Sequence, residues 1–103
     1  MADQIEETIK NISEQKGVEG IVVVNSDGIP LRSNLENDIK VKYSSLITQL
    51  ITKARNTIKN LNLSGDGQDN ELTFFRLRTK LHEILVSPEK EYLLIVIQKT
   101  TDV

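Results

Sequence analysis

The chain has no cysteine, one histidine, no tryptophan, two tyrosines and two phenylalanines among its 103 residues. Without cysteine, disulfides, thiolate metal sites and a thiol nucleophile are excluded. With a single histidine, the usual pairs of catalytic base and nucleophile cannot be assembled. The longest apolar runs are also far shorter than the roughly 20 residues that a membrane span needs. We therefore expect a protein that binds partners, performs no catalysis and does not insert into membranes.

The charge balance argues against two classes of partner. The formal net charge is -2, which gives no reason to expect nucleic acid or an anionic membrane. A basic stripe of Arg76, Arg78 and Lys80 lies beside the phenylalanines, an arrangement that can serve single-stranded nucleic acid. We interpret it instead as the solvated face of a strand edge. With 38% hydrophobic and 27% charged residues, the sequence indicates one globular domain over residues 1–103, beginning with an acidic helix rather than a signal peptide.

Two short apolar runs, Ile21–Val24 and Tyr92–Ile97, predict strands that are buried on both faces. The first run leads into the turn sequence Asn25-Ser-Asp-Gly28, so we expect a hairpin over residues 20–33. Its return strand contains Pro30, which cannot donate a backbone hydrogen bond. This strand therefore belongs at an edge of the sheet.

Two amphipathic segments predict helices. Residues 3–16 carry a narrow isoleucine stripe and end before Gly17, a candidate left-handed cap. Residues 38–61 carry a wide apolar stripe from Tyr43 to Leu61. A helix of this length extends for about 36 Å. A typical strand extends for about 20 Å, so we expect part of the stripe to lie beyond the domain's own sheet.

Three further strands follow a polar loop at residues 62–71, and we place them at 72–79, 81–87 and 92–98. If the two most apolar strands lie at the centre, the antiparallel order is 2-1-5-4-3. The predicted fold is therefore α/β of the α+β type, with the order helix, two strands, long helix, three strands, and a five-stranded sheet.

The third strand is the free edge of this sheet. Strand alternation places Phe75 on one face, and Leu72 and Phe74 on the other. Exposed phenylalanines on an edge strand are a liability in a monomer. Pairing with a second copy would cover them.

Few residues are candidates for chemistry. His82 alternates with Ile84 and Val86, which is typical of a surface or half-buried histidine on an amphipathic strand. The loop acids Asp66, Asp69 and Glu71 lack the ligand spacing of a calcium loop. We predict no catalytic residue, no cofactor and no metal.

Two segments resemble the roadblock family of dynein light chains: GVEGIVVVNSDGIPLRS at 17–33 and ELTFFRLRTKLHEILVSPEKEYLLIVIQ at 71–98. Short motifs such as Gly28-Ile-Pro30 and Arg76-Leu-Arg78 match in order and approximate spacing. The resemblance runs from about Ile5 to Gln98. The loop Ser64–Asn70 is longer than is usual in this family.

The resemblance implies a homodimer in which the third strands pair into one continuous ten-stranded sheet and the long helices pack side by side. By position, it places the following residues at the dimer interface: Leu46, Ile47, Leu50, Ile51, Ala54, Leu72, Phe74, Phe75, Arg76 and Arg78.

The resemblance also implies a function. It favours a non-catalytic light chain of a dynein motor complex that binds the dynein intermediate chain and takes part in microtubule-based transport. Such a subunit works in the cytoplasm on the cytoskeleton, or in the axoneme of a cilium or flagellum, and the residues leave this choice open. They also leave open a heterodimer with a paralogue. The alternative is a roadblock-type regulatory module that binds a small GTPase. An enzyme that uses His82 is the third hypothesis.

Overall fold

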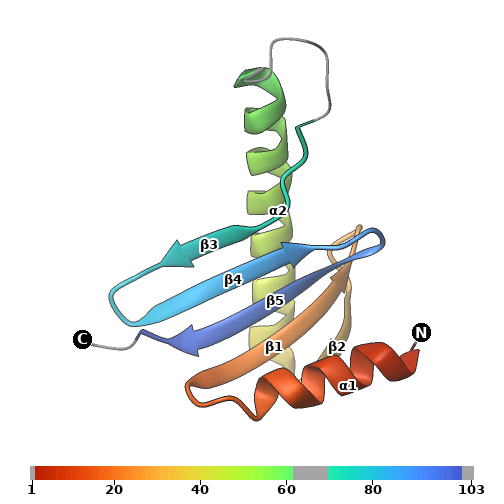
Figure 1. Cartoon of the computed structure of the whole chain (residues 1–103), viewed down its shortest axis with the longest axis vertical. Coiled ribbons are helices and arrows are strands. Elements are labelled where there is room, and N and C mark those ends of the chain that lie inside the picture. The colour runs from red at the N-terminus through yellow and green to blue at the C-terminus, as the bar shows by residue number, and fades with distance from the viewer. Residues whose placement is uncertain (1, 62–69, 101–103) are drawn as a thin grey trace.

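The computed structural model describes residues 2–61 and 70–100, which form two helices and one antiparallel sheet. The elements are α1 (Ala2–Ser13), β1 (Val18–Asn25), β2 (Pro30–Ser33), α2 (Asn37–Leu61), β3 (Phe75–Arg78), β4 (His82–Pro88) and β5 (Tyr92–Lys99). The strand order is β2-β1-β5-β4-β3, which confirms the predicted fold class and strand order (Figure 1). None of the helices described is long and apolar enough to cross a membrane.

The two most apolar strands, β1 and β5, lie side by side in the interior of the sheet, and most of their apolar side chains are buried. Residues Ile21–Val24 are at most 1% exposed, and Val22 pairs with Ile95 while Ile21 pairs with Val96. Burying each such side chain contributes about 1.5–3 kcal/mol. This run therefore forms a central part of the hydrophobic core.

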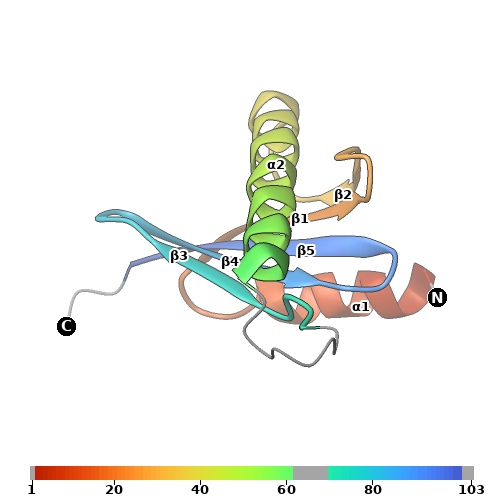
Figure 2. The ribbon, with the colours of Figure 1, turned by 90° about the horizontal axis from the view of Figure 1, so that it is seen from above.

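The helices lie on opposite sides of the sheet (Figure 2). Helix α2 places Ile47 and Ile51 against the side chains of alternate strand residues, among them Val22 and Ile95. Helix α1 packs on the other face, mainly against β1. The domain therefore has three layers, but each outer layer is a single helix.

The turns form where glycine and asparagine predict them. Gly28 has a φ of 83°, and the Asn25 side-chain oxygen accepts hydrogen bonds from the backbone N–H groups of Asp27 and Ile29, at 2.9 and 3.0 Å. Gly17 has a φ of 92° in the turn that leads into β1, but it does not directly follow α1, so the prediction that it caps the helix was wrong. Helix α1 ends earlier than predicted, at Ser13, whose hydroxyl donates to the Lys10 carbonyl at 2.9 Å. Such a local bond competes with continuation of the helix.

Strand β3 is shorter than predicted. Its ladder with β4 extends only from Phe75, opposite Val86, to Arg78, opposite Glu83. Leu72 therefore lies outside the strand, where alternation does not apply. It packs on the same side as Phe75, against the core beneath α2, so the prediction that Leu72 shares a face with Phe74 was wrong.

Candidate interaction surfaces

The outer flank of α2 is the first uncovered apolar surface. Leu46 and Leu50 are 55% and 36% exposed, and Ala54 is half-buried. Ile39, Val41 and Leu61 add further exposed apolar side chains on this helix, at 44%, 56% and 56%. A stripe about 140° wide is broader than the roughly 100° needed to face a core, so its margin stays in water.

The α2 residues expected at the dimer interface fall into two groups, one buried and one exposed. Ile47 and Ile51 are 7% and 1% exposed and belong to the domain's own core. In the single chain their side chains pack beneath the helix against the sheet, and their place at a dimer interface stays a prediction. Leu46 and Leu50, one residue earlier in each case, point away from the sheet. Of the helix residues expected at the interface, Leu46 and Leu50 are the ones whose side chains are exposed in the single chain.

The second uncovered surface is the edge strand β3, which pairs with β4 alone. Phe74 is 53% exposed and Leu77 is 37% exposed. Leu72 and Phe75, also expected at the interface, are half-buried and pack against the core. Of the aromatic pair, Phe74 is therefore the one that a partner could bury.

Arg76 has a structural partner within the chain. Its Nε–H donates to Glu83 Oε2 at 2.7 Å, and Gln98 Nε2 donates to the other carboxylate oxygen, also at 2.7 Å. Glu83 is 5% exposed. The hydrogen bond from Arg76, followed by that from Gln98, lowers the pKa of the Glu83 carboxyl, and the charge of Arg78 acts in the same direction. The Glu83 carboxylate in turn raises the pKa of Arg76.

Sequence reasoning missed Glu83. The register places it opposite Arg78 on β3 and Gln98 on β5, on the face that carries α1. An acid that shares a strand face with Leu81 and Leu85, with arginines on the strand beside it, is the pattern that could have predicted the pair. The hydrogen bond from Arg76 compensates the buried charge of Glu83, and it holds the Arg76 side chain in place at the surface.

His82 shows no catalytic arrangement. Its Nε2 lies 2.9 Å from Glu19 Oε1, and the two side chains are 41% and 38% exposed. This pair joins the beginning of β4 to β1 at the surface. Within residues 2–61 and 70–100, no group of three or more histidine, cysteine or acidic side chains could hold a metal ion. Asp66 and Asp69 lie outside the described residues, and Glu71 is exposed.

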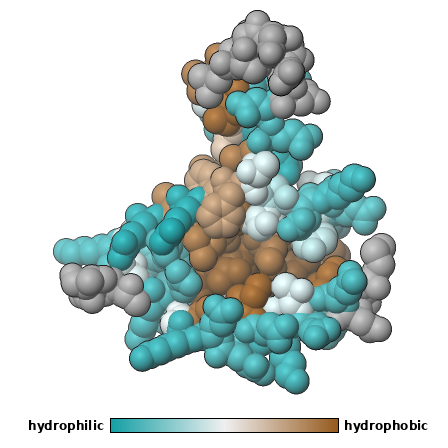
Figure 3. Space-filling view, in the orientation of Figure 1, coloured by the Kyte–Doolittle hydropathy of each residue, from teal (hydrophilic) through white to brown (hydrophobic). Residues whose placement is uncertain are grey.

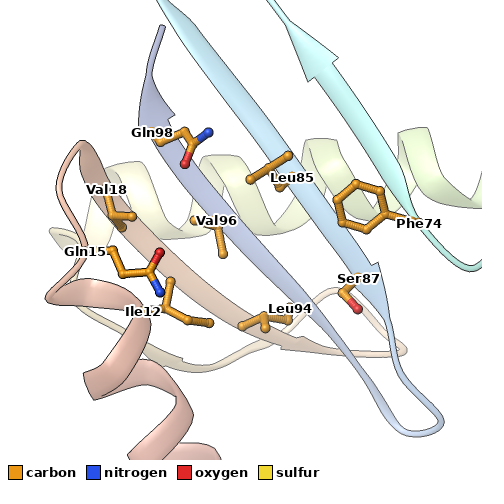
Figure 4. A pocket seen from close by; sticks show the side chains of 9 residues that line it. All are labelled: Ile12, Gln15, Val18, Phe74, Leu85, Ser87, Leu94, Val96 and Gln98. Atoms are coloured by element: carbon orange, nitrogen blue, oxygen red, sulfur yellow. The ribbon is translucent and has the colours of Figure 1, made fainter. Parts of the chain in front are cut away.

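The third surface is a hollow of about 220 Å³ on the face of the sheet that carries α1. Its floor consists of Leu85, Leu94 and Val96. Ile12 of α1 and Phe74 stand on opposite sides of it (Figure 4). The space-filling view shows an apolar surface over the middle of the sheet, surrounded by hydrophilic side chains (Figure 3).

The fold and these surfaces can be compared with known proteins. The family model for the Roadblock/LC7 domain matches residues 4–99. The Roadblock/LC7 domain from Streptomyces avermitilis superposes with a TM-score of 0.70 at 16% identity, covering 90% of this chain and 73% of that one. Myxococcus xanthus MglB superposes with a TM-score of 0.79 at 13% identity, covering 94% of this chain and 76% of that one. An MglB with a tetrameric arrangement superposes with a TM-score of 0.76 at 10% identity, covering 94% of this chain and 71% of that one.

At these identities the structural matches establish a shared fold and nothing further. The family model, in contrast, spans nearly the whole chain, from the isoleucine stripe of α1 to the end of β5. On this evidence, the chain belongs to the Roadblock/LC7 domain family.

Proposed function

We propose that this chain is a non-catalytic, self-associating Roadblock module that acts in the cytoplasm and regulates a small GTPase by binding it. The observation that carries the proposal is the pair of uncovered apolar surfaces, on α2 and β3. Surfaces of this kind are typical of protein–protein interfaces.

Self-association is the first step. Leu46 and Leu50 on α2, together with the β3 edge, are apolar groups that a second copy could bury. A two-fold contact uses the same patch on both copies, so the exposed groups of each copy could be buried against those of the other. The MglB structure with a tetrameric arrangement supports the expectation that domains of this fold associate.

Regulation of a GTPase is the second step. The sequence has no phosphate-binding loop, so the nucleotide would stay in the partner. The module would then act by binding one nucleotide state more tightly than the other, because only differential affinity can shift an equilibrium. We favour GTPase regulation over a role as a dynein light chain because two of the three matched structures are MglB proteins. The third is a Streptomyces domain, and none of the three is a dynein subunit.

The test uses the purified full chain and the small GTPases of its own cell. We expect one GTPase to bind with affinities for its GTP-bound and GDP-bound forms that differ by about tenfold or more. Calorimetry with each nucleotide form would measure both affinities. Equal affinity for both forms of every GTPase, or no binding, would overturn the proposal.

A dynein light chain remains the second candidate because the segments 17–33 and 71–98 resemble that branch of the family. It predicts binding to the isolated intermediate chain and none to any GTPase. The same calorimetric titration, carried out with purified fragments of the intermediate chain in place of the GTPase, separates the two functions.

A further inference from the structure

The sheet has two edge strands, β2 and β3, whose arginines are held in different ways. Within residues 2–61 and 70–100, β2 pairs with β1 alone and β3 pairs with β4 alone (Figure 1). An unpaired edge can add a strand from another chain. A domain that is adhesive at both edges would form open-ended chains, whereas one adhesive edge gives a closed pair. The groups that cover β2 therefore limit how far copies of this chain can assemble.

The β2 edge carries apolar side chains that could attract another strand. Ile29, just before the strand, is 55% exposed, and Leu31 is 44% exposed. Pro30 has no N–H to donate, and the register with β1 is irregular beside it. The Ser33 hydroxyl donates to the Ile21 carbonyl at 2.8 Å, so the chain turns back onto β1 at the end of the strand. The part of β2 that a second strand could reach is thus centred on Leu31.

Arg32 covers this part of the edge. Its Nη1–H donates to the Leu31 carbonyl at 2.8 Å, so this backbone acceptor is bonded to a side chain of its own strand. Its Nε–H donates to Glu6 Oε1 of α1, also at 2.8 Å, which fixes the guanidinium from a second element. An incoming strand would have to displace the guanidinium to reach the carbonyl. Two β2 edges that met would also bring two arginines together, and like charges opposite each other weaken strand pairing.

The arginine at the other edge binds differently. Arg76 on β3 donates from Nε to Glu83 on the neighbouring strand β4, so its side chain is directed over the sheet. Arg32, in contrast, binds a carbonyl of its own strand. Phe74, where the chain enters β3, is 53% exposed. These differences favour strand pairing at β3 over strand pairing at β2.

We infer that the contact of Arg32 with Glu6 and with the Leu31 carbonyl blocks the β2 edge, so that copies of this chain pair through β3 and extend no further. Once this contact is lost, the β2 edge of a second copy can pair with β2 about a two-fold axis. The inference goes beyond the proposed self-association through α2 and β3, and it can be tested without it.

The test uses full chains that carry Phe74→Asp at the β3 edge, so that pairing through β2 can be measured separately. We expect a further Arg32→Ala substitution to lower the dissociation constant for self-association by about tenfold or more, because it uncovers the carbonyl and removes the repelling charge. Glu6→Ala should act in the same direction with a smaller effect. Lys10→Ala, which removes an exposed positive charge from α1, is the matched control and should associate as the Phe74→Asp protein does.

Sedimentation velocity over a range of concentrations measures these dissociation constants. Each variant is compared with the Phe74→Asp protein, so the comparison stays valid if Phe74→Asp itself leaves some association through β3. In that case the proposed interface fails, and the inference about β2 is still decided by the change that Arg32→Ala produces.

Amide hydrogen exchange locates the new contact. Residues 31–33 of the Arg32→Ala protein should exchange more slowly at concentrations where it associates than at high dilution, and those of the Lys10→Ala protein should not change. Association no tighter than that of the Phe74→Asp protein, or tighter association without slower exchange at residues 31–33, would overturn the inference. If Arg32→Ala does not fold, Glu6→Ala decides: tighter association supports the inference, and unchanged association overturns it.

Discussion

At the scale of single residues, the hydrogen bonds around Glu83 lower the pKa of its carboxyl group. Glu83 is 5% exposed and accepts hydrogen bonds from Arg76 and Gln98. A buried carboxylate without such partners would be strongly unfavourable. The pair therefore makes Arg76 a structural residue first, although the sequence suggested only an interface role for it.

The stability of the fold should depend on pH through Glu83. Its pKa in the folded chain is lowered, while the unfolded value is about 4.3, so its contribution is present above the unfolded pKa and is lost as the pH falls through the folded one. We expect Glu83→Gln to melt below the wild type at neutral pH. The difference in melting temperature between the two proteins should become smaller as the pH falls from about 5 to about 3. Calorimetric melting of both proteins across this range measures it, and a constant difference would contradict the assignment.

Gly17 offers a test of backbone strain without steric interference. Its φ is 92°, and a Cβ built there meets nothing within 4 Å. We expect Gly17→Ala to lower the free energy of unfolding by about 1–2 kcal/mol, because an L-residue is strained in this region. Gly17→Asn should cost less, since asparagine tolerates it better. Urea denaturation compares the three proteins; equal losses in both variants would point to another cause.

At the scale of the element, α2 serves two surfaces. Ile51 is 1% exposed beneath the helix, whereas Leu46 is 55% exposed on its flank. Both belong to one apolar stripe in the sequence, and only packing against the sheet separates them. The flank is the part of the helix that remains for another molecule.

Substitutions on the two sides of α2 should affect two different properties, folding stability and self-association. Ile51→Ala should lower the free energy of unfolding by about 2–5 kcal/mol because it opens a cavity in the core. Leu50→Asp should weaken self-association because it would bury an unpaired charge between copies. Denaturation and sedimentation measurements on each variant separate the effects. Wild-type association in Leu50→Asp would remove α2 from the interface.

At the scale of the whole molecule, the edge strand β3 and the α2 flank carry apolar groups that nothing in residues 2–61 and 70–100 covers. Exposed edges of this kind favour pairing with another strand. Pairing of two copies along β3 would bury Phe74, which is 53% exposed in this chain.

We expect the purified chain to self-associate at micromolar concentration. Sedimentation velocity over a range of concentrations measures the fraction of monomer. Phe74→Asp should shift the distribution towards monomer, and Leu31→Asp, on the opposite edge strand, should leave it unchanged. A wild-type protein that sediments as a pure monomer would exclude the edge-pairing model.

Much of the fold could be predicted because local signals and burial agree. The apolar runs of β1 and β5, Pro30 at an edge and the glycine turns each specify their place through short-range chemistry. The bounds of β3 could not be predicted, because a strand ends where its neighbour stops pairing with it. The misassigned face of Leu72 has the same cause.

The sequence by itself determined the composition that excludes thiol chemistry, the helix and strand order, the sheet topology and the family. Only the tertiary structure decided which members of the α2 stripe face outwards, that Glu83 holds Arg76, and that half of one sheet face lies open beside α1. Periodicity gives the direction of a side chain relative to its own element. What that side chain meets depends on how distant segments pack, and this is settled only when the whole chain is folded.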